Sequence, residues 1–353
     1  GVQGDDIGAN AQQGSIYIFV RSGGAWALEQ NITASDGAGD ERFGSAVAIS
    51  ADGNTLVTGC YTGDVGANVN QGSAYVFTRA AGVWSQQQKL TASDGAAGDN
   101  FGSGVAISAD GDTVIIGASL DDTTGSAYVF IRAAGVWSQQ QKITASDGLA
   151  NDNFGTDVDI SNDGNRAIVA APTDDVGANA NQGSVYIFSR DGTTWSEDQK
   201  LTASDGQDGA QFGSDVALSG DGTVAVVGAQ YDDIGANANQ GSAYIFELSA
   251  GVWNEEQKLV ASDSEAGDFF GANLSISDEK LRAIRGNEIA MIFQEPMSSL
   301  NPVFTCGNQV IEAIMVHRKM ERGDAKEMAI GLFEEVKLPR PDKIINSYPH
   351  ELS

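Results

Sequence analysis

Residues 101–142 read FGSGVAISADGDTVIIGASLDDTTGSAYVFIRAAGVWSQQQK, and this stretch recurs along the chain with few changes. Each copy carries one Phe-Gly pair and one tryptophan. The Phe-Gly pairs begin at Phe43, Phe101, Phe154, Phe212 and Phe270, and the tryptophans are Trp26, Trp84, Trp137, Trp195 and Trp253. Successive tryptophans are 58 residues apart, except for one step of 53 where a shorter loop replaces residues 174–183. A fixed period of about fifty residues indicates a repeat architecture.

Each copy contains four short runs that predict β-strands. In the copy quoted above they span residues 105–108, 113–119, 126–132 and 136–144, and they are rich in Val, Ile and aromatic residues. An Asp-Gly pair between the first two runs predicts a tight turn, because glycine adopts positive φ at little cost. The fourth run is polar at residues 138–141, which suits an exposed sheet edge that resists pairing with a neighbour.

Four antiparallel strands per repeat, with a short polar outer strand, are typical of a β-propeller blade. A β-sandwich and a β-solenoid are the alternatives. A solenoid coil is shorter than this period, and a sandwich need not repeat its sequence. We therefore expect a mainly β chain, a partial propeller or small ring of about four to five four-stranded blades, with an α-rich C-terminal fragment.

Composition divides the chain near residue 274. Residues 1–273 hold 10 Lys and Arg against 36 Asp and Glu, whereas residues 274–353 hold 10 against 12. All five tryptophans lie in the first part, and all five methionines and both histidines lie in the second. One domain would not normally segregate residues in this way. We expect two unrelated domains, residues 1–273 and 274–353.

The acidity of the first part argues against nucleic acid and anionic membranes as partners. No run of about 18 apolar residues occurs, so no membrane-spanning helix is expected. Cys60 takes the place of an alanine in other copies and is expected to be a small buried strand residue rather than half of a disulfide. The repeats contain no histidine, and their paired carboxylates recur in every copy, so we expect no catalytic residues.

The order Phe-Gly, Val-Ala-Ile-Ser, Asp-Gly and Gly-Ala resembles the FG-GAP repeat. That family includes the seven-bladed propeller of integrin α chains and many secreted microbial proteins. The resemblance covers residues 1–273 and implies an extracellular or cell-surface adhesion module that binds a protein or glycan ligand. Propeller ligands bind on a loop-bearing face or in the central channel, and we expect the loop face formed by residues 174–181 and their counterparts. The number of copies departs from seven blades, which leaves an open arc or a smaller ring closed by pairing the first strands with the last.

The resemblance also raises the question of calcium, because related propellers carry Asp-x-Asp-x-Asp-Gly loops. Loops such as 108–111 have one Asp before the Gly, which is too few oxygen ligands. A second set of loops, typified by residues 174–181, alternates carboxylates and amides that Ca²⁺ could use. An Asx-turn loop that holds its own backbone is the alternative. The candidate ligands are Asp64, Asn68, Asp174, Asp175, Asn179, Asp232, Asp233 and Asn237.

Residues 284–302, IRGNEIAMIFQEPMSSLNP, resemble the Q-loop region of ATP-binding subunits of peptide-type ABC transporters. Residues 348–353, YPHELS, resemble the start of that family's signature motif. The resemblance implies Gln294 as the Q-loop glutamine, Leu352 and Ser353 as the first signature residues, and ATP and a membrane permease subunit as partners. A helix is also expected just after Gly323.

The motifs that grip phosphate are missing. No Gly-x-x-x-x-Gly-Lys-Ser/Thr sequence occurs, and the strand that carries the acidic Mg²⁺ ligand is absent. We therefore expect an inert ABC-ATPase fragment joined to a non-catalytic propeller, in a chimeric or mis-joined chain that is not an enzyme. The competing hypothesis is that function follows the C-terminal part, as the ATPase of peptide uptake. The third hypothesis is a structural surface protein that has no discrete ligand.

Overall fold

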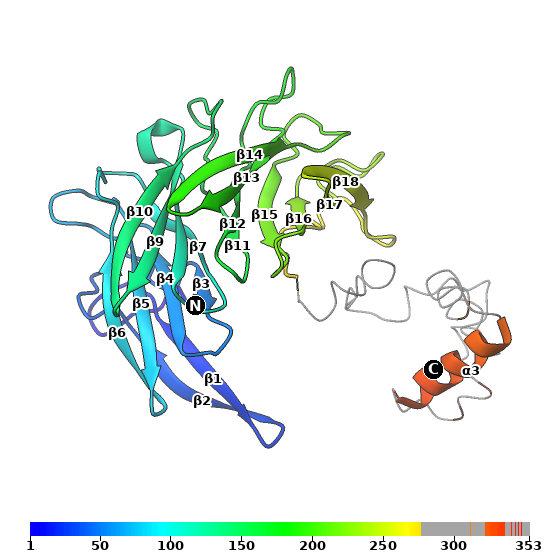
Figure 1. Ribbon diagram of the computed structural model, residues 1–353, viewed down its shortest axis with the longest axis horizontal. Helices are drawn as coiled ribbons and strands as arrows, with labels where there is room; N and C mark the ends of the chain where they lie inside the picture. The colour runs from blue at the N-terminus through cyan, green and yellow to red at the C-terminus, as the bar shows by residue number, and fades with distance from the viewer. Residues whose placement is uncertain are drawn as a thin grey trace. The chain divides into compact units, whose positions relative to one another are not determined.

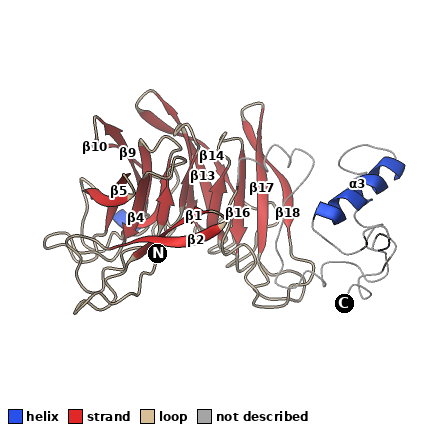
Figure 2. Cartoon of the chain, turned by 90° about the horizontal axis from the view of Figure 1, so that it is seen from below, coloured by secondary structure: helices blue, strands red, loops and turns tan. Residues whose placement is uncertain are grey.

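The computed structural model describes residues 1–276 and, further along, residue 311, residues 322–335 and residues 340, 343, 345 and 347. The chain forms two compact units, Gly1–Ser277 and Asp278–Ser353. The first unit is built from β-strands, and the described helices are the short η1 (Asp121–Thr123) and α3 (Arg322–Glu335) (Figure 2). The expected domain boundary at residue 273 lies four residues before the end of the first unit.

The first unit consists of one two-stranded sheet and four four-stranded antiparallel sheets, which stand side by side around an arc (Figure 1). We call the two-stranded sheet the half-blade and the others the first to fourth blades. The half-blade holds β1 (Ile16–Ser22) and β2 (Ala25–Ile32). The first blade holds β3 (Val47–Ile49), β4 (Thr55–Cys60), β5 (Ser73–Ala80) and β6 (Val83–Leu90). The second holds β7 (Phe101–Ile107), β8 (Thr113–Ala118), β9 (Ser126–Ala133) and β10 (Val136–Ile143).

The third blade holds β11 (Val158–Ile160), β12 (Arg166–Ala171), β13 (Ser184–Asp191) and β14 (Thr194–Leu201), and the fourth holds β15 (Phe212–Leu218), β16 (Val224–Ala229), β17 (Ser242–Ser249) and β18 (Val252–Leu259). In every blade the four strands pair in chain order, which is the meander predicted from the repeat. The first strands β3, β7 and β11 lie inside the arc, and the fourth strands lie outside it (Figure 1). The predicted mainly β, propeller-like fold is confirmed.

The half-blade remains a separate two-stranded sheet, so the alternative of a ring closed by pairing the first strands with the last is not found among the described residues. The remaining local predictions hold well. The Asp-Gly turns have glycine φ values of 68° to 73°, at Gly53, Gly111, Gly164 and Gly222. Cys60 is a free, fully buried strand residue. Helix α3 begins at Arg322, so Gly323 lies inside it instead of before it.

Each boundary between blades buries one apolar face of both neighbours. Between the first and second blades, Val57, Val76 and Leu90 pack against Tyr128, Phe130 and Trp137. Phe101 stands edge-on to Tyr128 and Phe130, with ring centroids 5.5 and 6.0 Å apart. Edge-to-face aromatic contacts add to the stabilisation from buried apolar area. The same packing recurs at each blade boundary.

A glycine before each third strand lets neighbouring blades approach. Gly125 has φ of 89°, and a Cβ there would stand 2.1 Å from the carbonyl oxygen of Phe154. The same arrangement occurs at Gly14, Gly72, Gly183 and Gly241, each against the Phe of the next Phe-Gly pair. Gly125 and Phe154 also form a parallel β-bridge. The Phe-Gly motif therefore marks a backbone contact between blades.

Substituting Gly125→Ala should lower the free energy of unfolding by about 3 kcal/mol or more, because the methyl group meets a backbone oxygen that cannot move aside. Gly135→Ala is the matched control. Gly135 has a similar φ of 81° but no atom within 4 Å of its Cβ position, so it should cost only about 1 to 2 kcal/mol of left-handed strain. Denaturant unfolding of both variants measures the difference, and equal losses would contradict the close approach.

Candidate functional site

A cluster of one lysine, one tyrosine and one or more aspartates joins each full blade to the preceding loop. In the third blade the Lys200 Nζ lies 2.7 Å from Asp147 Oδ2 and 2.6 Å from Asp174 Oδ2. The Tyr186 hydroxyl donates to Asp147 at 2.7 Å, and the Ser184 hydroxyl donates to Asp174. The lysine thus pairs with two carboxylates that its blade and the linking loop bring together, and one negative charge of the pair is left uncompensated.

The electrostatics of this cluster follow from its geometry. Burial alone would raise the pKa of Asp147, but hydrogen bonds from Lys200 and Tyr186 outweigh it and hold that pKa below its usual value. Burial alone would lower the pKa of Lys200, yet its two carboxylates raise it. Asp147 and Lys200 are therefore both charged at neutral pH.

The other blades vary this cluster without losing the lysine. In the fourth blade Lys258 pairs with Asp205 and Asp232, at 2.7 Å from each. The shorter loop of the second blade forms η1 and gives Lys142 three carboxylates, Asp94, Asp121 and Asp122. In the first blade Gly63 stands where other copies have the second aspartate, and Lys89 pairs with Asp36 at 2.8 Å.

The calcium candidates fall into three structural groups. Asp174 and Asp232 are the buried partners of Lys200 and Lys258 just described. Asp64, Asp175 and Asp233 each accept a backbone N–H six residues further on, from Asn70, Asn181 and Asn239 at 2.8 to 2.9 Å. Asn68, Asn179 and Asn237 donate to the side chains of Gln71, Gln182 and Gln240 at 2.8 to 2.9 Å.

These loops do not fit a bound Ca²⁺. The ion needs six to eight oxygen ligands, and the most buried candidate oxygens already face a lysine ammonium group. The described residues contain no group of three or more His, Cys, Asp or Glu side chains placed to hold a metal. The side chains hold their own loop, as the alternative to a metal site expected, but the aspartate bonds span six residues instead of the two of an Asx-turn.

A cavity of about 360 Å³ lies where the innermost strands of all four blades converge. It is lined by β3, β7, β11, β15 and residues 274–276. One side is apolar and is formed by residues such as Val47, Ile49, Val105 and Ile107. The other side carries Asp157, Asp159 and Asp215 from the third and fourth blades. This cavity is a concave site that the described part of the chain offers to a ligand.

Asp157 and Asp159 link the inner strands of the third and fourth blades, and Asp215 links the fourth blade to the segment that follows it. Asp157 Oδ2 accepts the Val216 N–H at 2.9 Å, and Asp159 Oδ2 accepts the Leu218 N–H at 2.7 Å. Asp215 Oδ2 accepts the Leu274 N–H at 2.5 Å in the same way. Separate blades of the described chain share no backbone hydrogen-bond ladder, and these side-chain hydrogen bonds link them instead. The same three aspartates also line the cavity.

Burial dominates the titration of these aspartates. It raises the pKa of Asp159 to about 7, against the effect of its backbone hydrogen bonds. The pKa of Asp215 also rises to about 7, through burial and then the nearby Asp157 carboxylate. The pKa of Asp157 is raised as well, chiefly by burial. Near neutral pH this wall of the cavity is only partly charged.

Sequence reasoning missed these three residues, although a signal was present. In the aligned copies the Asp157 position holds Ala46, Gly104, Asp215 and Asn273, and the Asp159 position holds Ala48, Ala106, Ala217 and Ser275. A carboxylate at an inner-strand position that is alanine in other copies departs from the repeat. The sequence signal is therefore a departure from the repeat, whereas the acidic residues that recur in every copy hide it.

The expected nucleotide-related residues Gln294, Leu352 and Ser353 lie outside the described residues. Within the described part, no helix has the length and apolar character needed to cross a lipid bilayer.

Comparison with known proteins agrees with the two-part composition. The FG-GAP repeat profile matches residues 26–77, 84–130, 137–188, 195–246 and 253–282, well over half of the chain. Curated relatives match a short segment. The chain is 45% identical over 86 residues to a probable peptide ABC transporter ATP-binding protein of Sinorhizobium fredii, covering 24% of this chain and 26% of the relative. It is 39% identical over 98 residues to the oligopeptide transport ATP-binding protein AppD of Bacillus subtilis, covering 26% and 30%.

The chain thus spans about a quarter of the length of the curated relatives it matches. Among solved structures, it resembles a candidate 6-phosphogluconolactonase from Bacteroides fragilis. The TM-score is 0.48 and the identity 16%, over 73% of this chain and 67% of that one. A likeness at this level carries no argument about function.

Protein stability should fall as the pH rises from about 5 to about 8. Asp159 and Asp215 have folded-state pKa values of about 7, above their usual value of 3.8, so the folded state binds protons more tightly. Their stabilisation is complete below pH 4 and is lost as the pH rises through 7. Asp159→Asn, which keeps an oxygen for the Leu218 N–H, should flatten this slope in thermal melts. An unchanged slope in the variant would contradict the assignment.

Proposed function

Because the chain belongs to the FG-GAP repeat family, we propose that it is a non-catalytic, extracellular binding module of adhesion type with a protein or glycan ligand. The use of the polar groups supports this proposal. The carboxylates of the blade clusters are paired with lysines, and those of the loops bind backbone N–H groups. Such side chains are engaged in holding the fold, whereas a catalytic acid or nucleophile needs a free reacting atom.

The cavity at the centre of the arc is the observation that carries the proposal. Every blade contributes its innermost strand to it, so its shape depends on the whole repeat array and not on one loop. About 360 Å³ falls in the range of small-molecule sites and would also hold one inserted side chain or sugar residue. Its acidic and apolar sides favour a ligand group that combines apolar surface with hydrogen-bond donors.

Binding can be tested with the fluorescently labelled full chain on a glycan array and on a peptide array. We expect retained ligands whose binding falls at least about tenfold in the double variant Asp157→Asn/Asp159→Asn. Asp191→Asn, which changes an exposed carboxylate at the β13–β14 turn, is the matched control and should bind normally. The proposal fails if neither array retains the chain, or if the double variant binds as well as the control.

A second candidate function comes from the curated relatives, which are ATP-binding proteins of peptide transport. We propose instead that the C-terminal segment is an inert fragment of such a protein, joined to the propeller in a chimeric or mis-joined chain. The 353 residues contain no phosphate-binding loop with its lysine. Without that backbone cradle the β- and γ-phosphates of ATP have nothing to hold them.

Isothermal titration of the full chain with Mg-ATP should give no binding up to millimolar concentrations, and no phosphate should be released. The reason is the missing phosphate-binding loop. Micromolar affinity, or hydrolysis above a buffer control, would favour the transport ATPase. Sequencing the codons for residues 270–281 from source DNA would show whether the junction exists in the gene.

A further inference from the structure

The two ends of the blade array present complementary faces to solvent. Inside the array, each blade places a Tyr, a Phe and a Trp against the blade before it. The tyrosines of the four full blades are fully buried and their tryptophans are 3–4% exposed. On the half-blade the corresponding residues Tyr17, Phe19 and Trp26 are 41%, 52% and 67% exposed. We call this exposed surface the aromatic face.

The fourth blade exposes the surface that normally covers such a face. In the first three blades, the counterparts of Val226 are fully buried and those of Leu259 are 2–3% exposed. On the fourth blade, Val226 and Leu259 are only half buried, and Glu256 and Gln257 are exposed. We call this surface, formed by β16, β17 and β18, the aliphatic face.

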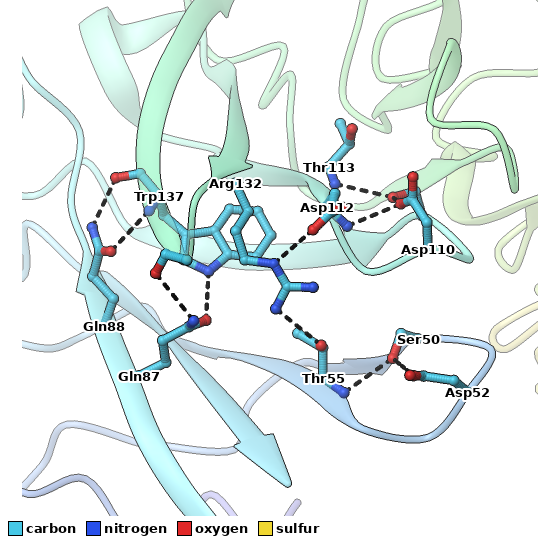
Figure 3. A network of polar contacts seen from close by, with 12 residues as sticks. Ser50, Asp52, Thr55, Gln87, Gln88, Asp110, Asp112, Thr113, Arg132 and Trp137 are labelled. Atoms are coloured by element: carbon cyan, nitrogen blue, oxygen red, sulfur yellow. Dashed lines mark hydrogen bonds and ion pairs between the residues drawn. The ribbon is translucent and has the colours of Figure 1, made fainter. Parts of the chain in front are cut away.

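A glutamine clasp joins these two kinds of face inside the chain. Gln88 on β6 donates to the Trp137 carbonyl at 2.9 Å and accepts the Trp137 backbone N–H at 3.0 Å. The neighbouring Gln87 accepts the Trp137 indole N–H at 2.9 Å (Figure 3). Gln30, Gln141 and Gln199 hold Trp84, Trp195 and Trp253 by the same pair of bonds, at 2.8 to 3.0 Å.

The clasp is specific, because one carboxamide satisfies both backbone groups of a single residue, as a neighbouring strand would. Four internal boundaries use it. Gln257 is the fifth glutamine at this position of the repeat, and Trp26 is the fifth tryptophan. One faces solvent at one end of the array, and the other faces solvent at the opposite end.

We propose that a second copy of this chain docks its aromatic face on the aliphatic face of the fourth blade, with Gln257 clasping Trp26 of the incoming copy. The contact continues an interface that the chain already forms four times. It is heterologous, because two different surfaces meet, so copies add head to tail.

Two residues of the half-blade make this contact weaker than an internal boundary. In the first blade, Gln86 accepts the backbone N–H of Ser35 in the preceding loop. The other full blades have Gln or Glu at this position, but the half-blade has Leu28, which cannot accept a hydrogen bond. Asn31 replaces the lysine of the blade cluster. The half-blade also offers two strands instead of four, so it buries less surface than a full blade would. Each copy carries a net charge of −28, so association should strengthen with salt, which screens the repulsion.

Sedimentation equilibrium of the full chain over a concentration series, at low and high salt, tests the proposal. We expect reversible, salt-promoted association. Trp26→Ser should weaken it about thirtyfold or more, because a central aromatic anchor is lost. Gln257→Ala should weaken it about tenfold. Leu149→Ser, which changes a 63% exposed loop residue away from both faces, is the control and should behave as the parent chain.

Mixing the two variants distinguishes this contact from others. Trp26→Ser retains an intact aliphatic face and Gln257→Ala an intact aromatic face, so the mixture should recover the parent affinity in a complex that stops at two chains. Circular dichroism confirms that both variants fold. A monomer at all concentrations, or association insensitive to either variant, would overturn the proposal. So would a mixture that does not recover, since two aromatic faces meeting symmetrically would need only Trp26.

Discussion

A blade of this protein has two apolar faces, and it can bury both only between two other blades. The aromatic side is built from a tyrosine, a phenylalanine and a tryptophan, and the aliphatic side from Val, Ile and Leu, so each boundary joins unlike surfaces. Apolar burial of this kind supplies most of the stabilisation but is not directional. The glutamine clasp and the glycine approach to the Phe carbonyl give the boundary its register.

Two sets of carboxylates respond differently to pH. On the loop side, the ion pairs of Lys200 raise the pKa of the lysine and hold that of Asp147 below its usual value, so this contact depends little on pH near neutrality. The carboxylates of the innermost strands accept backbone N–H groups, and burial governs their protonation. Aspartate thus forms lysine ion pairs in the loops, whereas in the cavity wall it changes its protonation near neutral pH.

Much of the fold could be predicted from the sequence, because the repeat multiplies every local signal. The strand order, the Asp-Gly turns and the burial of Cys60 follow from alternation and turn chemistry that recur in phase. The role of the outer strand could not be predicted. Residues 138–141 suggested an edge that repels neighbours, whereas Gln140 and Gln141 bind the next blade. Their partners lie more than fifty residues away, and no local pattern reveals such contacts.

The site was harder to predict than the fold. Loops rich in Asp and Asn suggested metal ligands, because the same oxygens serve a cation or the loop's own backbone, and only the distances separate the two. Conversely, Asp157 and Asp159 gave a weak signal on their own. Their place in the cavity depends on strands from four blades meeting at the centre, which is a property of the assembled arc.

The short loop around η1 shows how little of the loop surface the blades require. Residues 121–125 form a loop half as long as residues 174–183, yet this loop also places a carboxylate, that of Asp121, against the lysine of its blade, Lys142. In the first blade, Gly63 takes the place of the second aspartate, and Lys89 pairs with the single carboxylate of Asp36. Connections on this side can therefore be lengthened, trimmed or grafted while the sheets keep their order. The loop sequences can thus change while the sheets stay the same. This property makes the repeat a convenient scaffold for displaying foreign peptides.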